Sequence, residues 1–255
     1  MEPIWNAPAL AFDCDGKRWL AISELHIGME SGLARRGAFL RTRTATMSAA
    51  LSALVAQSKA RRLLILGDVK DRVHGTSPQE RRDVPTFFSA LHDLEQVLIT
   101  RGNHDAGLQD LLPKERFPNV TIAPASGTLL GGPGGVGALH GHAWPKAELL
   151  SAATILVGHT HAAARLVDEQ GQARTEWAWA RGRLDGAATA LKYGVRVSPD
   201  VIVFPPFNTL LGGAAVNRDG ILGPMGKLVD EASIRLHLLD GRDLGRITKK
   251  RRPTR

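Results

Sequence analysis

Short apolar runs recur along the chain, and each stops abruptly at a Gly, Asp, Asn or His residue. Their length and their content of leucine and β-branched residues are typical of buried strands. These runs occupy residues 19–23, 63–66, 97–100, 136–139 and 154–157. Longer stretches with helical spacing lie between them, at residues 45–57, 84–94, 105–112 and 146–151. The alternation of strands and helices predicts an α/β domain.

Two turn signals modify this pattern. Asp15-Gly16 separates ALAFDC from KRWLAI, and Gly171 lies between ARLV and ARTEWAW. Both arrangements are typical of hairpins, so the sheets are predicted to be mixed rather than purely parallel. A Pro-rich segment at residues 201–213 then breaks the alternation. No linker or repeat divides the chain, which predicts a single domain over residues 1–241.

Composition narrows the class of protein. The 255 residues are 43% hydrophobic and 23% charged, which excludes a disordered chain or a coiled coil. The single cysteine, Cys14, excludes an internal disulfide framework and a Cys-rich zinc module. No apolar run approaches the roughly 20 residues that cross a bilayer, and the first residues do not resemble a signal peptide. We therefore expect a soluble cytoplasmic protein that does not associate with membranes.

Positive charge is concentrated in two places. The net charge is +8, but residues 242–255 hold seven basic residues and one acid, so the rest of the chain is nearly neutral. We expect this basic tail to be flexible, either as a solvated terminus or as a source of salt-sensitive affinity for a polyanion. The second cluster comprises Arg35, Arg36, Arg41 and Arg43. It fits either the solvated face of a helix or a phosphate-binding surface.

Histidine, carboxylate and carboxamide side chains gather at the ends of the predicted strands. Six of the nine histidines belong to such blocks. The loops that follow strands in an open α/β sheet converge on one crevice, so these side chains are expected to meet there. The residues concerned are Glu24, His26, Asp68, Asn103, His104, Asp105, His140, His142, His159 and His161. Such a set predicts a metal site more readily than a group of structural histidines.

The chemistry of these ligands restricts the metal. Imidazole, carboxylate and carboxamide without thiolate suit Mn²⁺, Fe²⁺ or Zn²⁺, and we expect Mn²⁺ first. The set is larger than one ion requires, which predicts two ions that clamp a phosphoryl group and activate water. A carboxylate must then bridge them. Asp68 is the best candidate, because Gly67 allows a sharp backbone turn directly before it.

The order of the blocks resembles the calcineurin-like metallophosphoesterase superfamily. The blocks are Glu24-x-His26, Gly67-Asp68, Gly102-Asn103-His104-Asp105, His140 and Gly158-His159-x-His161. SELHIGME, LGDVKD and FPPFNTLLGG are more closely similar to archaeal phosphoesterases related to double-strand-break repair nucleases and to bacterial ligase- or helicase-associated phosphoesterases. The resemblance implies a four-layer sandwich of two mixed β-sheets flanked by helices. It also implies that a helicase or a ligase is a candidate partner protein.

The resemblance implies a role for each residue. Two overlapping ligand sets are expected: Glu24, His26, Asp68 and His161 for the first metal, and Asp68, Asn103, His140 and His159 for the second. His104 would donate a hydrogen bond or a proton to the phosphate or the leaving oxygen, and Asp105 would orient it. A metal-bridging hydroxide would attack phosphorus in line.

Some positions leave alternatives open. The superfamily usually has Asp where this chain has Glu24, so the first site is either adjusted or only half-occupied. Either histidine of HGH can face a metal; the motif order favours His140 and leaves His142 to support a ligand. Asp71 either orients a ligand or contacts a substrate, or it is an ordinary loop carboxylate. Other side chains outside the set are Trp144, a candidate substrate wall, Asn208, a candidate polar contact, and the surface or core residues His74, His92 and His237.

These observations predict a two-metal-dependent phosphoester hydrolase. We expect a phosphodiesterase that acts on nucleic acid or nucleotides, because of the closer resemblance and the arginine cluster. One alternative is a phosphohydrolase of small molecules such as a cyclic nucleotide or a nucleotide pyrophosphate. Another is a non-catalytic scaffold with a decayed metal site, although a scaffold has no chemical need for His104 and Asp105.

Overall fold

The computed structural model of the protein describes residues 1–247. The expected flexible tail falls mostly on residues 248–255, which lie outside the described residues. The part of the tail that is described belongs to a sheet, because Asp243–Arg246 forms strand β15. The boundary expected after residue 241 is therefore misplaced: Leu236 pairs with Gly245 and Arg235 with Arg246, which ties this segment to the domain.

The first sheet has six strands in the order β1-β2-β3-β4-β5-β6. The first three pair antiparallel, and β3 to β6 run parallel, so the sheet is mixed. The strands are β1 (Glu2–Ile4), β2 (Ala9–Cys14), β3 (Lys17–Ile22), β4 (Arg62–Ile65), β5 (Gln96–Thr100) and β6 (Val120–Ala123).

The second sheet is also mixed, and its nine strands include the path β13-β10-β11-β12-β9-β8-β7. Strand β14 pairs with β11, and β15 pairs with β14. The strands are β7 (Thr128–Leu130), β8 (Val136–Leu139), β9 (Thr154–Val157), β10 (Ala162–Val167), β11 (Ala173–Arg183), β12 (Asp200–Val203), β13 (Ala214–Ala215), β14 (Arg235–Leu238) and β15 (Asp243–Arg246).

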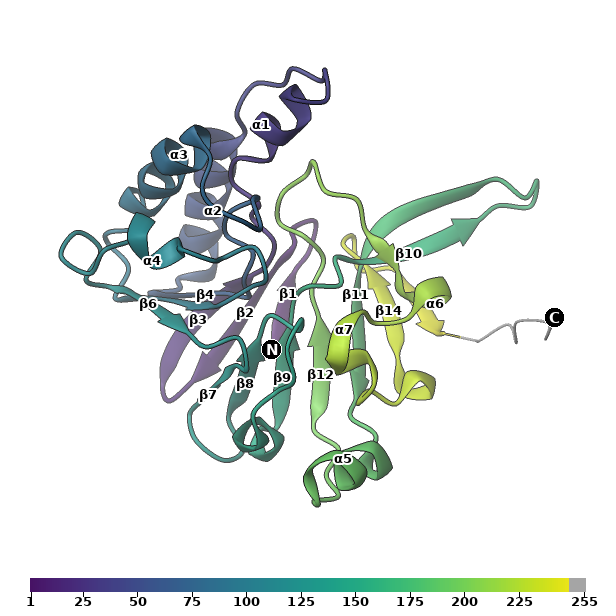
Figure 1. The fold of residues 1–255 in the computed structure, drawn as a ribbon. Helices are drawn as coiled ribbons and strands as arrows, with labels where there is room; N and C mark the ends of the chain where they lie inside the picture. The colour runs from purple at the N-terminus through teal and green to yellow at the C-terminus, as the bar shows by residue number, and fades with distance from the viewer. Residues whose placement is uncertain (248–255) are drawn as a thin grey trace.

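Helices flank the two sheets, and α5 lies beyond one end of β11 and β12 (Figure 1). Those beside the first sheet are α1 (Met29–Ala34), α2 (Thr44–Ser58), α3 (Pro78–Ser89) and α4 (Leu108–Leu111). Those beside the second sheet are α5 (Gly186–Tyr193), α6 (Val216–Asp219) and α7 (Gly223–Gly226). Two short 3₁₀ helices, η1 (Ala147–Ser151) and η2 (Glu231–Ser233), complete the elements. Within the described residues, no helix has the length and apolar content needed to span a bilayer.

Three apolar clusters hold the layers together. One fills the space between the two sheets and includes Phe12, Trp19, Leu156, Trp179 and Phe204. The other two lie between each sheet and its own helices. Burying this much apolar surface on both faces of each sheet is the main favourable contribution to folding. The expected four-layer α/β sandwich of two mixed sheets flanked by helices is therefore confirmed.

The predicted elements recur with small shifts in their ends. Strands β8 and β9 have the same bounds as the predicted ranges 136–139 and 154–157. Both predicted hairpins are present. Helix α3 differs most, because it begins at Pro78 rather than near residue 84. The Ser77 side chain accepts a hydrogen bond from the Glu80 amide, and Glu80 reaches back to the Ser77 amide. Because of this capping box, the helix begins more than one turn before Val84, the first of its buried apolar residues.

Candidate metal centre

The polar blocks lie where strands of the two sheets end. Glu24 and His26 follow β3, Asp68 follows β4, and Asn103 to Asp105 follow β5. His140 follows β8 in the second sheet, and His159 and His161 follow β9. Backbone hydrogen bonds bring these loops together: the Glu24 amide donates to the Gly67 carbonyl at 3.3 Å, and the His26 amide donates to the Asp68 carbonyl at 2.9 Å. Residues far apart in sequence therefore share one site.

Glu24 lies at the contact between the sheets and is fully buried. Its Oε1 accepts hydrogen bonds from the Ser23 hydroxyl at 3.0 Å and from the His159 amide at 2.6 Å. Its Oε2 lies 2.9 Å from Nε2 of His161 and 3.2 Å from Nε2 of His26. The longer side chain of Glu24, relative to the usual Asp, therefore still reaches both histidines of the first expected ligand set.

Asp68 occupies the middle of the cluster and is 2% exposed. Its Oδ2 lies 3.5 Å from Nε2 of His26 and 3.3 Å from Nε2 of His140. Its Oδ1 accepts a hydrogen bond from the His104 amide at 2.9 Å. Asp68 is thus within reach of one histidine from each expected ligand set, as a bridging carboxylate must be.

The second expected set is assembled around His140, whose ring is completely buried. Asn103 Oδ1 lies 3.1 Å from His140 Nε2, and His140 Nδ1 lies 2.7 Å from the Leu66 carbonyl. This carbonyl contact can hold the ring in one orientation with Nε2 directed at the cluster. The His159 ring lies 5.0 Å from that of His140, measured between ring centroids.

Left-handed backbone is concentrated at this site. Within residues 1–247, eight residues other than glycine have positive φ, and five of them are expected ligands. These are Glu24, His26, Asp68, His159 and His161, with φ of 61°, 41°, 51°, 63° and 49°. Such conformations cost on the order of 1–3 kcal/mol each and cluster at functional sites. Packing elsewhere in the fold must therefore offset the cost of directing these side chains at one point.

Glycines around the site allow the loops to approach closely. A Cβ on Gly102 would lie 2.1 Å from Oδ1 of Asp68, and one on Gly158 would lie 2.9 Å from Oε1 of Glu24. Gly67 has a φ of 80°, and a Cβ there would lie 2.6 Å from Nδ1 of His140. The sharp turn expected before Asp68 is present. These three positions have no room for any larger residue.

Two buried histidines have raised pKa values. Burial alone would lower the pKa of His26, but the hydrogen bonds to Asp71 and Glu24 and the charge of Asp68 outweigh burial and raise it to about 10. Burial likewise opposes the charges of Glu24 and Asp68 at His140, and the pKa of His140 rises to about 9. In the metal-free protein, protonated imidazoles thus balance the buried carboxylates.

The pKa values of the neighbouring His159 and Glu24 are lowered instead. Burial and the nearby His140 lower the pKa of His159 to about 4. Burial acts to raise the pKa of Glu24, but His140, His161 and His26 more than offset it and hold that pKa well below its usual range. At neutral pH, Glu24 is therefore ionised and His159 is neutral, which are the protonation states that bind metal ions.

His104 and Asp105 have different surroundings from those expected. The His104 Nδ1 atom contacts the Asp71 carbonyl, and its Nε2 lies 3.9 Å from Oδ2 of Asp68. Asp105 is fully buried, and its carboxylate accepts hydrogen bonds from the amides of Gly102, Asp68 and Val69 at 2.8–2.9 Å. The expectation that Asp105 orients the His104 ring is therefore wrong. Asp105 positions the loops after β4 and β5, and the Asp71 carbonyl contacts the His104 ring.

Asp71 is part of the cluster, although the sequence left its role open. Its Oδ1 lies 3.3 Å from Nδ1 of His26. The one feature of the sequence that could have predicted this contact is the position of Asp71, three residues after the expected bridging carboxylate. Asn208, in contrast, is fully buried and donates to the Leu25 carbonyl at 2.9 Å, so it supports the loop that carries Glu24.

The remaining histidines stay outside the centre. The His142 ring lies 5.2 Å from that of His140, and its Nδ1 is buried with no hydrogen-bond partner among the described residues. His92 lies beside Asp93 and His237 beside Asp243, while His74 belongs to the loop between β4 and α3.

Trp144 is 36% exposed, and its ring lies 4.2 Å from the Lys192 ammonium.

The donor set fits divalent cations. Three groups of ligand atoms form within the described residues, and the atoms of each group lie within 4.8 Å of one another. The groups are Glu24, His26 and His161; Glu24, Asp68 and His140; and His26, Asp71 and His104. Shared members join the groups into one continuous cluster of nitrogen and oxygen donors. Such donors suit Mn²⁺, Fe²⁺ or Zn²⁺.

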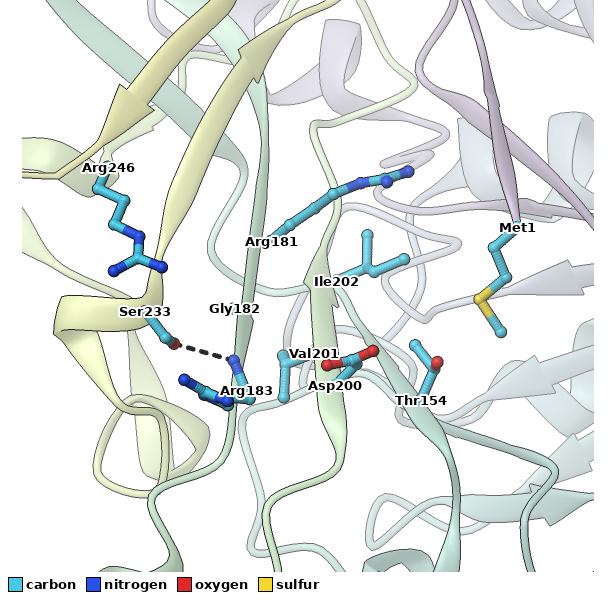
Figure 2. Close-up of a pocket in the computed structure, with 10 residues that line it drawn as sticks. All are labelled: Met1, Thr154, Arg181, Gly182, Arg183, Asp200, Val201, Ile202, Ser233 and Arg246. Atoms are coloured by element: carbon cyan, nitrogen blue, oxygen red, sulfur yellow. Dashed lines mark hydrogen bonds between the residues drawn. The ribbon is translucent and has the colours of Figure 1, made fainter.

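A separate pocket lies away from this cluster, at the opposite ends of β9 and β12 (Figure 2). Its volume is about 530 Å³, and its lining includes Arg181, Arg183, Arg246, Thr154 and Asp200. None of its lining residues is a histidine, and Asp200 is its one carboxylate. The pocket therefore lacks the donors of a metal centre.

Comparisons with known proteins agree with this architecture. The chain is similar to the structure of nuclease MPE from Pseudomonas putida, with 18% identity and a TM-score of 0.55 over 91% of this chain and 97% of the nuclease. Yfce, a phosphoesterase from E. coli, matches with 15% identity and a TM-score of 0.40 over 90% of this chain and 99% of Yfce. No protein-family model matches the sequence, and no curated protein is similar to it. The chain therefore has the fold of nuclease MPE, the metallophosphoesterase fold that the sequence resemblance predicts.

Proposed function

We propose that the protein is a metal-dependent phosphodiesterase whose substrate is nucleic acid or a nucleotide. The main support is the continuous cluster of buried carboxylates and histidines at the strand ends of both sheets. The left-handed backbone of five of these residues adds to it, since strain is retained where function requires it. The shared fold with a nuclease agrees with the proposal.

We assign two metal ions to the cluster, with Mn²⁺ as the preferred metal. Glu24, His26, Asp68 and His161 would hold the first ion. Asp68, Asn103, His140 and His159 would hold the second. Support comes from Asp68, whose Oδ2 lies within 3.5 Å of nitrogens of both His26 and His140. Asp71, which contacts His26 Nδ1, would hold that ring in its ligating orientation.

Divalent cations at this site would polarise a phosphoryl oxygen and provide a water of lowered pKa. The protein's own contribution is to position the reacting groups. The His104 side chain is 23% exposed, and its Nδ1 contacts the Asp71 carbonyl. To act as a proton donor, His104 must be an imidazolium that keeps its Nδ1 proton on that carbonyl and presents its Nε2 proton to the leaving oxygen. We assign His104 as the residue that donates a proton to the leaving oxygen.

The first test is hydrolysis of bis-(p-nitrophenyl) phosphate with added Mn²⁺. We expect turnover that requires the metal and stops with a chelator. Cleavage of only the monoester analogue would contradict a phosphodiesterase. A metal-loaded protein without turnover on either analogue would favour the scaffold alternative.

A nucleotide or other small molecule is the second candidate substrate, because residues 1–241 are nearly neutral in charge. Salt dependence separates the two candidates. Affinity for a polyanion falls steeply with salt, whereas affinity for a small diester changes little. A steep salt dependence of kcat/KM would therefore favour nucleic acid.

A further inference from the structure

The segment between α1 and α2 combines positive charge with exposed apolar side chains. We call residues 35–43 the arginine loop; it includes Arg35, Arg36, Arg41 and Arg43 and has no regular secondary structure. Phe39 is 84% exposed and Leu40 is 49% exposed. This arrangement differs from the solvated helix face that the sequence allowed. Phe39 and Leu40 thus leave apolar surface in water, next to arginines, that a ligand can cover.

The charges of the arginine loop are not neutralised by the protein. Within residues 1–247, no carboxylate lies within ion-pair distance of Arg35, Arg36, Arg41 or Arg43. The Arg43 guanidinium donates instead to the Thr209 hydroxyl at 2.8 Å. Several guanidiniums without acidic partners form a surface that attracts anions.

Nearby carboxylates exist, but they hold the base of the loop instead. Glu30 is 5% exposed and accepts hydrogen bonds from the Arg43 amide at 2.6 Å and from the Gln79 side chain at 2.9 Å. Asp83, also 5% exposed, accepts a hydrogen bond from the Thr42 hydroxyl at 3.0 Å. These contacts fix the end of the loop that joins α2. The two carboxylates therefore hold the loop in place but do not pair with its guanidinium groups.

The arginine loop is connected at both of its ends to segments that carry the metal centre. Helix α1, which leads into it, begins at Met29, shortly after His26. Thr209, the partner of Arg43, follows Asn208, whose amide donates to the Glu24 carbonyl at 3.1 Å. Figure 1 shows the loop rising next to the segment that joins β12 to β13. The Arg43 end of the loop is therefore linked to the Glu24 side of the centre through Thr209 and Asn208.

We propose that the arginine loop binds an unpaired polynucleotide strand next to the scissile phosphodiester, an assignment that rests on the proposed function. The guanidiniums would contact phosphates flanking the reacting one. Phe39 would stack on a base, which requires that the base be unpaired and accessible. A duplex hides the faces of its bases, so we commit to a single strand. The loop would then make a polymer a better substrate than a small diester.

Binding is measured by fluorescence anisotropy with labelled oligodeoxythymidylate in EDTA, so that no cleavage occurs. The probe is longer than about 16 nucleotides, the upper site size of a single-strand-binding fold. We expect Arg35→Gln/Arg36→Gln to weaken binding roughly tenfold and to reduce the salt slope by about 1.4, since each phosphate contact contributes about 0.7. We expect Phe39→Ala to weaken binding on the order of tenfold at high and low salt alike.

Matched controls remove the same charge, or an exposed apolar side chain, elsewhere on the protein. Arg183→Gln/Arg246→Gln changes two exposed arginines of the distant pocket in Figure 2. Leu191→Ala changes a side chain that is 92% exposed on α5. We expect both controls to bind like the parent protein. Equal losses in the control and arginine-loop variants would show that binding is a general effect of net charge and would overturn the proposal.

Kinetics separate this proposal from the proposed function. With Mn²⁺, the ratio of kcat/KM for the oligonucleotide to kcat/KM for bis-(p-nitrophenyl) phosphate should fall roughly tenfold in the arginine-loop variants. An unchanged ratio, or tighter binding of a duplex than of a single strand, would overturn the loop assignment while diester hydrolysis stands. Oligonucleotide binding that depends on the loop, without hydrolysis of any diester, would instead refute the proposed function.

Discussion

At the scale of single residues, the centre depends on side chains in unfavourable backbone conformations and on glycines that leave room for them. Asp68 combines both, since its φ is 51° and its carboxylate lies against Gly102. Small residues at such positions cannot be replaced without moving a loop. The geometry of the centre is therefore more sensitive to these glycines than to most exposed residues.

Gly102→Ala should abolish diester hydrolysis and weaken Mn²⁺ binding strongly. The added Cβ would lie 2.1 Å from Oδ1 and 2.4 Å from the backbone nitrogen of Asp68, so Asp68 must shift. Metal titration and circular dichroism would measure affinity and fold. The matched control is Gly186→Ala, whose Cβ would meet only flexible side chains of Arg196 and Ser198 at 3.2 Å. Activity of Gly102→Ala equal to that of the control would contradict the observed packing.

His104→Ala should reduce turnover by about 10²–10⁴-fold while metal content stays unchanged. Only the proton donor is removed, because His104 is not among the proposed metal ligands. Steady-state kinetics and elemental analysis of the same preparation would measure both quantities. Parental turnover would refute the role of His104, and loss of metal would make it a ligand.

At the scale of elements, the strands were easier to predict than their connections. Each strand around the site is a short run buried on both faces, so its apolar residues alone mark its position. Helix α3 was misjudged because its start is set by polar capping between Ser77 and Glu80 rather than by apolar spacing. Strand β15 was missed because its residues are polar, charged or glycine apart from Leu244, and its pairing with β14 is long-range information.

Ser77→Ala should destabilise the protein by about 1 kcal/mol, the usual cost of losing a helix N-cap. The Ser77 hydroxyl accepts the Glu80 amide at 3.2 Å, and Glu80 also accepts the Arg72 amide at 2.6 Å. Urea denaturation would measure the free energy of unfolding. Ser89→Ala, at the other end of α3, is an exposed control. Equal stability of the two variants would argue against the cap.

At the scale of the whole molecule, the strand ends of two sheets together form one centre. The motif order predicted a shared site, and the structure brings Glu24, His26, Asp68, His140 and His161 into one cluster. The role of Asp105 could not be predicted from the sequence, because a carboxylate beside a histidine in sequence can accept hydrogen bonds from backbone amides instead. The place of Asp71 likewise depends on how the loop after β4 folds over His26.

Binding of Mn²⁺ should release protons near pH 8 and strengthen as pH rises. His26 and His140, with folded pKa values of about 10 and about 9, are protonated in the metal-free protein and must lose their protons to bind metal. Titration calorimetry in two buffers of different ionisation enthalpy would count the protons. Identical heats in both buffers would contradict the assigned protonation.

The same pKa shifts determine how the stability of the metal-free protein depends on pH. The raised pKa values of His26 and His140 contribute stability that is fully present below about pH 6.5 and is lost as pH rises through about 9 and 10. The lowered pKa of His159, about 4, acts at the acid side, where stability is lost as pH falls from about 6.5 towards that value. Thermal unfolding in a chelator should therefore give a maximal Tm near neutral pH; a Tm that rises steadily to pH 10 would refute this.

The most direct test is the number of Mn²⁺ ions that one chain binds, measured by titration calorimetry for the parent protein and for Asp68→Asn. We predict two ions per parent chain, and severe weakening of both sites in the variant, because Asp68 contacts a histidine of each ligand set. A single ion per chain would reduce the centre to a half-occupied site. Binding that is absent, or that is unaffected by Asp68→Asn, would contradict the account.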